Sequence, residues 1–370
     1  MKNKKKILFL IPSLFGGGSE RFTVNAANNL SKENDVYIAY YIKKKKSYKI
    51  DPKVKILKLQ SKNAKIFFLK LIFFLIKNNN FKYIFSSIVH MNVYLIILNI
   101  LFFGKFKTII RETNTPIGEL KYNKNLQTIV HFIIRIFYNF AYKIVSPTNV
   151  IKNQLVRYFF IKKDKIVTIF NFIDITQVLK LSKKKTFGKK KSKLQKYIVC
   201  VGSLTEQKNH LFLIKAFSKI NPKKNIKLLI IGEGYLKNKI EKFINIRKIR
   251  NIKIFKNVIN PFYYLKNSNL VVSTSLWEGL PNSLIESSLI NSNILSFRSI
   301  SGPEEIKKKG ISIDIFNNSN IDSKQAIRNF SRVLFYKFKK KQKIKTILSN
   351  KKILENLNHL SVIKLNKLFN

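Results

Sequence analysis

Cysteine is almost absent from the sequence. Cys200 is the only one among 370 residues, so no disulfide can form within the chain and no site built from several thiolates can exist. The four histidines, His90, His131, His210 and His359, are scattered and lack the spacing of metal ligands. These absences exclude a fold held together by disulfides, and they favour a reducing cytoplasm as the compartment.

Acidic residues are also scarce. The chain has 18 Asp and Glu against 72 Lys and Arg, a formal net charge of +54. The excess is mostly Lys, so one interpretation is a compositional bias that fills solvated faces with Lys, and the other is attraction to a polyanion. Arg, which supplies bidentate contacts to bases, is rarer, and no nucleic-acid-binding signature occurs. Of the polyanions we therefore expect an anionic membrane surface, and no specific nucleic acid.

Long apolar runs are missing as well. Two candidates, Ile66–Ile76 and Val93–Phe103, are each shorter than the ~20 residues that a membrane-spanning helix needs. The basic N-terminal residues and the apolar stretch Ile7–Leu14 imitate a signal peptide, but no small-residue cleavage site follows. We therefore expect a buried first strand and no transmembrane segment.

The chain does contain enough apolar sequence for two packed domains, because 45% of its residues are hydrophobic. Strand-like apolar runs alternate with segments of helical spacing, which predicts parallel sheets covered by helices on both faces. The Lys-rich stretch Ser182–Lys196 interrupts this alternation, which restarts at Tyr197. We predict domains over residues 1–180 and 197–350, a basic linker over 181–196, and a helical tail over 351–370 that packs toward the first domain.

The segment Trp277–Glu286 carries two carboxylates after a predicted strand. Its Gly-Leu-Pro turn leads into a helix that begins with Asn282 and Ser283, and ligands of doubly wound sheets bind beyond the carboxyl ends of strands. A helix N-terminus there suits a phosphate. Glu278 precedes the helix and Glu286 lies about one turn into it, so both can accept hydrogen bonds from the hydroxyls of a nucleotide-linked sugar. The alternative is a capped helix with two solvated glutamates.

Three other turns follow predicted strands. Val201–Asn209 contains Lys208, which suits a diphosphate but is also one lysine among many. Gly16–Arg21 and Gly232–Gly234 contain glycines that allow the backbone to approach a phosphate closely. Neither matches a Rossmann fingerprint or a P-loop. A plain tight turn is therefore the alternative for both glycine segments.

Together these segments resemble the retaining family-four glycosyltransferases, which have the GT-B fold. Residues 260–268, Ser275–Asn282 with Glu286, and Ser301–Ile306 are similar to the family's donor-site block in order and spacing. Residues 16–21, 169–174 and 201–209 extend the resemblance to nearly the whole chain, and it is most specific over residues 197–306.

The resemblance implies two Rossmann-like α/β/α domains that face each other across a cleft, with the acceptor side first and the nucleotide-sugar site second. It implies transfer of a hexosyl or N-acetylhexosaminyl group from a nucleotide diphosphate sugar, with retention of the anomeric configuration. The usual donor in the family is a UDP-sugar. The acceptor would be a cell-surface glycan or a lipid-linked molecule, as in lipopolysaccharide, capsule or polysaccharide biosynthesis. No cofactor or metal is implied, since side chains usually hold the diphosphate.

The resemblance also assigns roles to matched positions. Glu278 would contact the transferred sugar, Glu286 the ribose, and Lys208 the diphosphate, which makes Glu278 and Lys208 the catalytic candidates. The full donor-binding set is Gly17, Gly18, Ser203, Lys208, Gly279, Leu280, Asn282, Ser283 and Glu286.

Two departures from the family pattern stand out. Ser203 occupies a position where the family often has Arg, so Arg21 or Lys208 has to balance the diphosphate charge. Many members carry a His near the acceptor, whereas the stretch after the predicted strand at 108–110 reads Arg-Glu-Thr-Asn. A related Ser-Glu-Arg-Asn pattern exists in the family, so Glu112 and Asn114, with Arg21, become the acceptor-side candidates.

Two other functions are compatible with the sequence. One is a different nucleotide-sugar enzyme on the same fold, such as an epimerase, and the other is a non-catalytic polyanion-binding or membrane-binding protein. Ile66–Ile76 with its lysines is expected either to dock on anionic lipid or to form a core helix. We expect the protein in the cytoplasm, with peripheral contact at the inner face of the plasma membrane.

Overall fold

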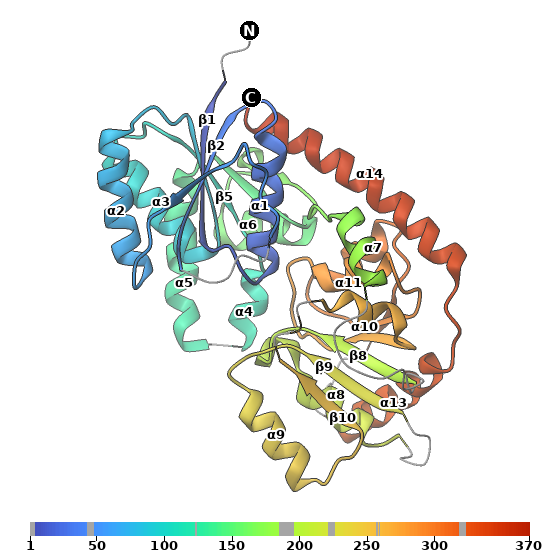
Figure 1. Ribbon diagram of the computed structural model, residues 1–370. Coiled ribbons are helices and arrows are strands. Elements are labelled where there is room, and N and C mark those ends of the chain that lie inside the picture. Colours follow the sequence, from blue (N-terminus) through green and yellow to red (C-terminus); the bar gives the residue numbers. More distant parts are fainter. Residues whose placement is uncertain are drawn as a thin grey trace. The chain divides into compact units, whose positions relative to one another are not determined.

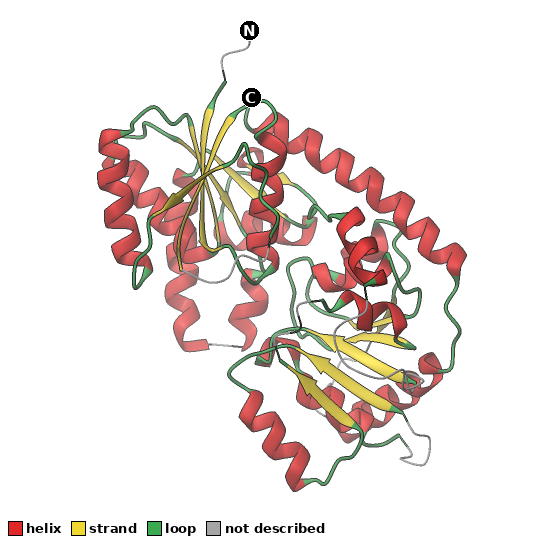
Figure 2. Cartoon of the chain, in the orientation of Figure 1, coloured by secondary structure: helices red, strands yellow, loops and turns green. Residues whose placement is uncertain are grey.

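The computed structural model describes residues 4–42, 48–122, 124–184, 196–220, 226–256, 258, 260–317 and 323–370. For residues 120–122 and 124–128 it describes the backbone only. The chain divides into two compact units, Met1–Phe172 with Leu357–Asn370, and Ile173–Asn356. Each unit is a parallel sheet with helices packed on it (Figures 1 and 2), which confirms the predicted class of two Rossmann-like α/β domains. Their arrangement across a cleft stays a prediction, as does the domain division at residue 180.

The first unit contains a seven-stranded sheet in the order β3-β2-β1-β4-β5-β6-β7. Every described pairing in it is parallel, and β1 is buried along its length because its residues are almost all apolar. The strands are β1 Lys6–Ser13, β2 Asp35–Ile42, β3 Lys55–Lys58, β4 Tyr83–Ser87, β5 Lys107–Arg111, β6 Lys143–Ser146 and β7 Ile166–Thr168.

Helices cover both faces of this sheet, with α2 and α3 on one side and α1 on the other (Figure 1). One core joins apolar side chains of α2, α3, α5 and α6, and a second core joins α1 with the C-terminal residues. The helices are α1 Gly18–Leu30, α2 Ala64–Lys77, α3 Val89–Leu101, α4 Pro116–Tyr122, α5 Lys124–Phe137 and α6 Asn149–Phe159, with 3-10 turns η1 Tyr138–Phe140 and η2 Lys163–Lys165.

The second unit contains a six-stranded parallel sheet in the order β10-β9-β8-β11-β12-β13. Phe212, Phe297 and Phe330 pack together in its core. The strands are β8 Tyr197–Val201, β9 Lys227–Ile231, β10 Ile252–Phe255, β11 Leu270–Ser273, β12 Ile294–Phe297 and β13 Asp314–Phe316. The helices are α7 Ile175–Lys183, α8 His210–Phe217, α9 Lys237–Ile246, α10 Phe262–Asn267, α11 Asn282–Ser288, α12 Pro303–Lys308 and α13 Lys324–Phe338, with the 3-10 turn η3 Glu206–Lys208.

The last helix, α14 (Ile344–Leu368), contributes to both units. Near its start, the Asn350 side chain donates a 3.1 Å hydrogen bond to the carbonyl of Ser288 in the second unit. At its end, Leu365 and Leu368 lie in the core of the first unit, and the Phe369 ring lies 5.3 Å from that of Tyr83. The C-terminal residues are therefore part of the first unit's core.

Two segments with alternative interpretations now have a structure. The apolar stretch after the basic N-terminal residues is the buried strand β1. Ile66–Ile76 lies within α2, whose Phe67, Phe68, Leu71 and Leu75 are buried, so one face of this helix belongs to the core. Within the described ranges, no helix is both long enough and apolar enough to cross a membrane. Most of the predicted linker, residues 185–195, lies outside the described residues.

Candidate functional site

The segments predicted to bind the donor lie at one edge of the second sheet. β8 pairs with β9 and β11, and β11 pairs with β12, all in parallel. The turns that follow these strands therefore meet at the carboxyl edge, where open α/β sheets bind ligands. These turns contain Lys208 after β8, Glu233 after β9, Glu278 after β11 and Ser301 after β12.

Lys208 and Glu278 form an ion pair between Nζ and Oε1. Their side chains are 20% and 9% exposed, so the pair is largely shielded from water and forms a charge-assisted hydrogen bond. Glu286 is buried on α11. The edge therefore combines an ammonium group, which can neutralise a phosphate, with carboxylates, which can accept hydrogen bonds from hydroxyl groups.

Glycine is required where the turns of this edge pack together. A Cβ at Gly232 would lie 1.9 Å from the carbonyl oxygen of Gly202, and one at Gly234 would lie 2.3 Å from that of Leu204. The Leu204 N–H also donates to the Glu233 carbonyl at 2.8 Å. The Gly-Glu-Gly turn thus supports the turn that carries Ser203, which is a packing reason for its glycines.

A second close approach fixes the Glu278 turn. Gly302 has a φ of +81°, and a Cβ there would lie 2.6 Å from Pro281 Cδ and 3.1 Å from Glu278 Cβ. The Ser301 hydroxyl donates to the Gly279 carbonyl at 3.2 Å. Ser301 and Gly302 lie in the segment Ser301–Ile306, which resembles part of the family's donor-site block. The sequence alone assigned no role to either residue, because a packing contact between loops has no sequence motif.

The predicted helix after the Gly-Leu-Pro turn is short. It spans seven residues, Asn282–Ser288, and its N-cap residue, Pro281, provides no side-chain capping hydrogen bond. Asn282 and Ser283 are half-buried at this start, and the Ser283 carbonyl accepts a 2.6 Å hydrogen bond from the Ser287 hydroxyl. The phosphate-binding roles of Asn282 and Ser283, and of Gly279 and Leu280, stay predictions.

Burial removes two other groups from acid–base chemistry. It raises the pKa of the Cys200 thiol to about 12, so this thiol is unreactive. It lowers the pKa of His210 to about 4, and the neighbouring Lys208 charge acts in the same direction. Neither ring nitrogen of His210 has a hydrogen-bond partner among the residues that the structure describes. His210 is therefore neutral near pH 7.

The glycine turn of the first unit follows β1. Gly16 has a φ of +112°, and the Tyr48 hydroxyl lies 2.6 Å from the Gly16 carbonyl and 2.9 Å from that of Gly17. Gly17 precedes α1, which begins at Gly18. Arg21 lies over the Tyr48 ring at 5.9 Å. Tyr48 therefore holds the turn from the carbonyl side, and diphosphate binding at Gly17 and Gly18 stays a prediction.

Glu112 follows β5 and lies in a buried polar network. It is 2% exposed, and its carboxylate accepts hydrogen bonds from the Tyr138 hydroxyl at 2.9 Å and from the Thr113 N–H at 3.0 Å. Asn92 donates to the Tyr138 oxygen at 3.0 Å. Burial, and then the charge of Glu119, raise the pKa of Glu112 to about 7. The predicted acceptor-side carboxylate is thus enclosed by the first unit.

Asn114 occupies the outer part of the same loop. Its side-chain amide donates a 2.6 Å hydrogen bond to Glu119 Oε1, and its side-chain oxygen accepts one from the Thr115 N–H. Glu119 is half-buried, and burial raises its pKa. Glu119 was not among the predicted site residues, because nothing in its sequence context relates it to Asn114. The acceptor-side roles of Glu112, Asn114 and Arg21 stay predictions.

Two family models match the chain. The model described as "Glycosyl transferases group 1" matches residues 182–345, and "Glycosyltransferase Family 4" matches residues 16–177. Together they cover most of both units. The chain belongs to the family-four glycosyltransferases.

Curated relatives of this glycosyltransferase are also glycosyltransferases by name. "Uncharacterized glycosyltransferase MJ1059" of Methanocaldococcus jannaschii is 34% identical over 207 residues, 54% of this chain and 50% of that protein. "Capsular polysaccharide biosynthesis glycosyltransferase CapH" of Staphylococcus aureus is 30% identical over 182 residues, 48% of this chain and 47% of that protein. These matches therefore span about half of each relative's length.

A third relative aligns over most of its length. The "N-acetylgalactosamine-N,N'-diacetylbacillosaminyl-diphospho-undecaprenol 4-alpha-N-acetylgalactosaminyltransferase" of Campylobacter jejuni is 28% identical over 333 residues, 86% of this chain and 88% of that protein. Among solved structures, the sucrose-phosphate synthase of Thermosynechococcus elongatus has a TM-score of 0.76 at 10% identity. The match covers 99% of this chain and 98% of the synthase chain. Anabaena Alr3699/HepE in complex with UDP and glucose has a TM-score of 0.67 at 12% identity, with coverages of 99% and 98%. At these identities the structural likeness shows the fold.

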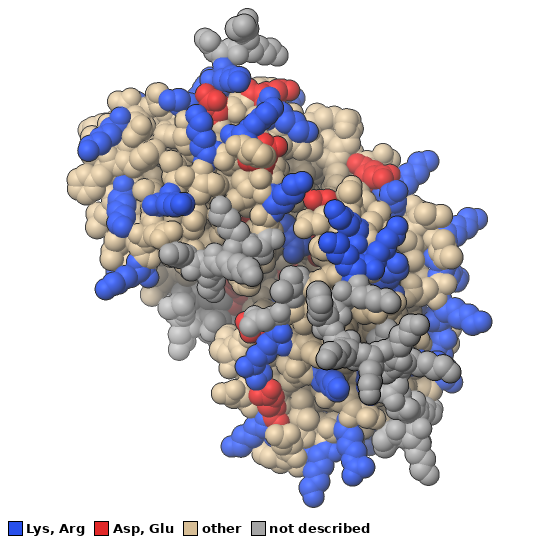
Figure 3. Space-filling model, in the orientation of Figure 1, with Lys and Arg blue, Asp and Glu red and all other residues tan. Residues whose placement is uncertain are grey.

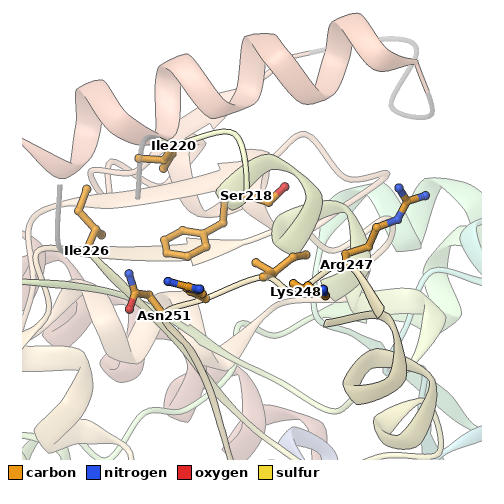
Figure 4. A pocket seen from close by; sticks show the side chains of 9 residues that line it. Ser218, Ile220, Ile226, Arg247, Lys248 and Asn251 are labelled. Atoms are coloured by element: carbon orange, nitrogen blue, oxygen red, sulfur yellow. The ribbon is translucent and has the colours of Figure 1, made fainter. Parts of the chain in front are cut away.

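A cavity of about 320 Å3 lies away from the sheet edge that carries Lys208 and Glu278 (Figure 4). Its lining comes from the end of α8 and from the residues just before β9 and β10, which is the amino edge of the sheet. The lining residues are Phe217, Ser218, Ile220, Ile226, Arg247, Lys248, Ile249, Arg250 and Asn251. It shares no residue with the predicted donor set.

Proposed function

We propose that this family-four glycosyltransferase moves a hexosyl or N-acetylhexosaminyl group from a UDP-sugar to a glycan or lipid-linked acceptor, with retention of configuration. The observation that carries the proposal is the Lys208–Glu278 ion pair at the carboxyl edge of the second sheet. The diphosphate of such a donor matches the ammonium group of Lys208, and the hydroxyl groups of its sugar match the carboxylate of Glu278.

Each residue has a defined task in this mechanism. Lys208 stabilises the negative charge that develops on the departing diphosphate, which is electrostatic stabilisation by a positioned cation. Glu278 accepts hydrogen bonds from the transferred sugar, and Glu286 accepts them from the ribose. The acceptor hydroxyl attacks from the face that the diphosphate leaves, and a diphosphate oxygen takes its proton. We propose that transfer needs no metal ion or other cofactor.

The relatives support the choice of substrates. The name of the Campylobacter jejuni relative describes a sugar acceptor linked to diphospho-undecaprenol, and that of CapH describes capsular polysaccharide biosynthesis. The Alr3699/HepE structure contains UDP and glucose. A UDP-sugar and an acceptor used in cell-surface polysaccharide synthesis are therefore the first substrates to test.

The membrane part of the proposal rests on exposed apolar side chains of the first unit. α3 contacts both α2 and α5, and these three helices and the turn after α3 carry exposed apolar residues that we call the apolar helix face. Between Pro52 and Lys163 the sequence has two acidic residues, Glu112 and Glu119, both in the polar network. The apolar helix face consists of Ile66, Leu69, Phe73, Ile76, Ile97, Ile100, Leu101, Phe103, Ile129, Phe132 and Ile136.

The apolar helix face combines apolar side chains, which can insert into a bilayer, with positively charged lysines. Phe103 is 99% exposed beside Lys105, and α2 adds Lys65, Lys70 and Lys77. Apolar side chains flanked by lysines suit the interface of an anionic bilayer. We propose peripheral binding at the cytoplasmic face of the plasma membrane, where a lipid-linked acceptor is within reach. Flotation with anionic vesicles tests this, and failure to bind them at physiological salt would contradict it.

The catalytic proposal is tested with purified protein, a panel of nucleotide diphosphate sugars, and a polyprenyl-diphosphate sugar as acceptor. UDP and its sugars should raise the melting temperature, because a ligand that binds only the folded state stabilises it. Glu278→Gln should lower transfer by about 100-fold, as loss of a positioned polar contact does. Glu241→Gln is the matched control, since Glu241 pairs with Lys237 at 2.9 Å on the exposed side of α9.

Three outcomes distinguish the alternatives. Activity that survives excess EDTA supports transfer without a metal. No response to any uridine or guanosine nucleotide, together with anionic-vesicle binding that Glu278→Gln leaves unchanged, would favour a non-catalytic membrane-binding protein. Conversion of a nucleotide sugar without any acceptor would favour an epimerase.

A further inference from the structure

Two segments of the second unit hold the Lys208–Glu278 pair. The turn η3, which ends at Lys208, follows β8, and the loop with Glu278 follows β11. β8 and β11 are neighbouring parallel strands, with Ile198 opposite Leu270. Both segments leave the sheet at the same edge, and besides the ion pair they are joined there by hydrogen bonds of Gln207 and Thr274.

Gln207 makes two of these bonds. Its side-chain amide donates to the Trp277 carbonyl at 2.8 Å, and its own carbonyl accepts from the Leu276 N–H at 2.8 Å. The residue immediately before Lys208 is thus attached on both sides to the two residues that precede Glu278.

Thr274 makes the other link, with one hydroxyl proton shared between two carbonyls. Its buried hydroxyl lies 3.0 Å from the Lys208 carbonyl and 3.2 Å from the Asn209 carbonyl. Asn209 has a φ of +49°, so the backbone turns sharply here to begin α8. The hydroxyl of Thr274 is therefore directed at the carbonyls of that sharp turn.

We propose that Gln207 and Thr274 are positioning residues for the donor. Their hydrogen bonds hold η3 against the 274–278 loop, so that Lys208 can contact the diphosphate and Glu278 the sugar of the same donor molecule. A lysine side chain has four rotatable bonds and is flexible, so its ammonium group is placed less accurately if the backbone moves as well. The hydrogen bonds of Gln207 and Thr274 restrict that backbone movement. The inference rests on the proposed function, because the donor is what the pair is positioned for.

The chain offers a matched control for Gln207. Gln342 also donates its side-chain amide to backbone carbonyls of the second unit, those of Lys266 and Ser268 at 3.2 and 3.0 Å. These bonds lie away from the turns of the donor edge. Gln342→Ala therefore removes the same kind of bond from the same unit and leaves the donor residues in place.

The experiment compares Gln207→Ala, Thr274→Val, Thr274→Ser and Gln342→Ala with the wild type, using UDP as the binding probe and a UDP-sugar with its acceptor for kinetics. Gln207→Ala and Thr274→Val each remove one side-chain donor, and a hydrogen bond of ~1 kcal/mol corresponds to about 5-fold. We expect kcat/KM for the donor to fall by this factor in Gln207→Ala and Thr274→Val, and KM for the acceptor to stay unchanged. Thr274→Ser should restore most of the loss, because it keeps the hydroxyl.

The outcomes separate three cases. Gln207→Ala with a melting temperature like that of Gln342→Ala and donor kinetics within twofold of wild type would overturn the positioning role. Failure of Thr274→Ser to recover activity would overturn it for Thr274. A wild-type protein that neither binds UDP nor transfers any sugar would overturn the proposed function itself, and the positioning role with it.

Discussion

At the scale of single residues, Lys208 and Glu278 act as a pair, so the loss of one member differs from the loss of both. Lys208→Met leaves a largely shielded carboxylate without its cation, which costs about 1–3 kcal/mol for an unsatisfied buried group. We expect Lys208→Met to lower the free energy of unfolding more than the double variant Lys208→Met/Glu278→Gln does. Urea unfolding measures this, and equal losses in the two variants would contradict the pairing.

Glu112 provides a second prediction, on pH. Its pKa in the folded protein is about 7, against an ordinary value of 4.5, because burial and the Glu119 charge favour the protonated form. The folded state therefore binds the proton more tightly, and the contribution of Glu112 to stability falls as pH rises from 4.5 to 7. Glu112→Gln should thus gain stability relative to wild type as pH rises across this window.

The comparison of wild type with Glu112→Gln is needed because His210 acts in the opposite direction. The pKa of His210 is lowered from 6.5 to about 4, so its contribution is present above pH 6.5 and is lost as pH falls toward 4. The two effects oppose each other in wild type, but His210 is common to both proteins and cancels in their difference. Urea unfolding at pH 5, 6, 7 and 8 measures that difference. A difference that does not change with pH would contradict the raised pKa.

The sequence singled out Lys208 and Glu278, which the structure brings together, and missed the residues that hold them. Lys208 and Glu278 could be predicted because each lies in a recognisable segment after a strand, although their ion pair could not. Gln207 and Thr274 bond to backbone carbonyls, and such bonds can be made by many residue types, so no pattern marks them. Glu119 was missed for a similar reason, since its contact with Asn114 depends on how the loop after β5 folds.

At the scale of elements, the glycines between turns give a testable contrast. Gly232→Ala would place a Cβ 1.9 Å from the Gly202 carbonyl, so the backbone must move, whereas the atoms nearest to a Cβ at Gly202 belong to the flexible Lys208 side chain, at 3.4 Å. We expect Gly232→Ala to cost about 1–3 kcal/mol, as overpacking does, and Gly202→Ala to cost less. Thermal unfolding of both variants compares them, and equal costs would contradict the packing role of Gly232.

The long buried strands were predictable because continuous apolar runs with turn residues after them are typical of parallel sheets. β1 covers most of the apolar stretch Ile7–Leu14, β5 includes the predicted strand at 108–110, and β8 begins at Tyr197, where the alternation restarts. The strands β3, β7, β12 and β13 were missed, since each has only three or four residues and three of them include half-buried or exposed positions. Pairing with a neighbouring strand, which sequence patterns do not encode, makes these short segments strands.

At the scale of the whole molecule, the fold of the first unit depends on residues from the far end of the chain. Leu365 on α14 is completely buried in the core of the first unit, whereas Leu360 on the same helix is exposed. Leu365→Ala should lower the free energy of unfolding by about 2–5 kcal/mol, and Leu360→Ala should change it little. Urea unfolding followed by circular dichroism measures both. Equal effects would show that α14 contributes no core packing there.

The net charge of +54 raises the question of whether membrane binding needs a defined surface at all. Lys and Arg side chains are spread over the visible face with few acidic ones among them (Figure 3), so charge alone predicts binding that any basic region supports. The apolar helix face predicts more. Leu69→Ser/Phe73→Ser removes two exposed apolar side chains from α2 and leaves every lysine in place.

We expect this double variant to bind anionic vesicles at least about 10-fold more weakly than wild type, since burial of such side chains contributes about 1.5–3 kcal/mol each. Ile246→Ser/Tyr336→Ser, which removes two exposed apolar side chains from the second unit, should bind as wild type does. Raising the salt to 1 M shortens the range of electrostatic attraction to about 3 Å, so the binding that survives reports the apolar part. If both variants bind like wild type and 1 M salt releases all three proteins, charge alone attracts this glycosyltransferase to the bilayer and the apolar helix face has no part in docking.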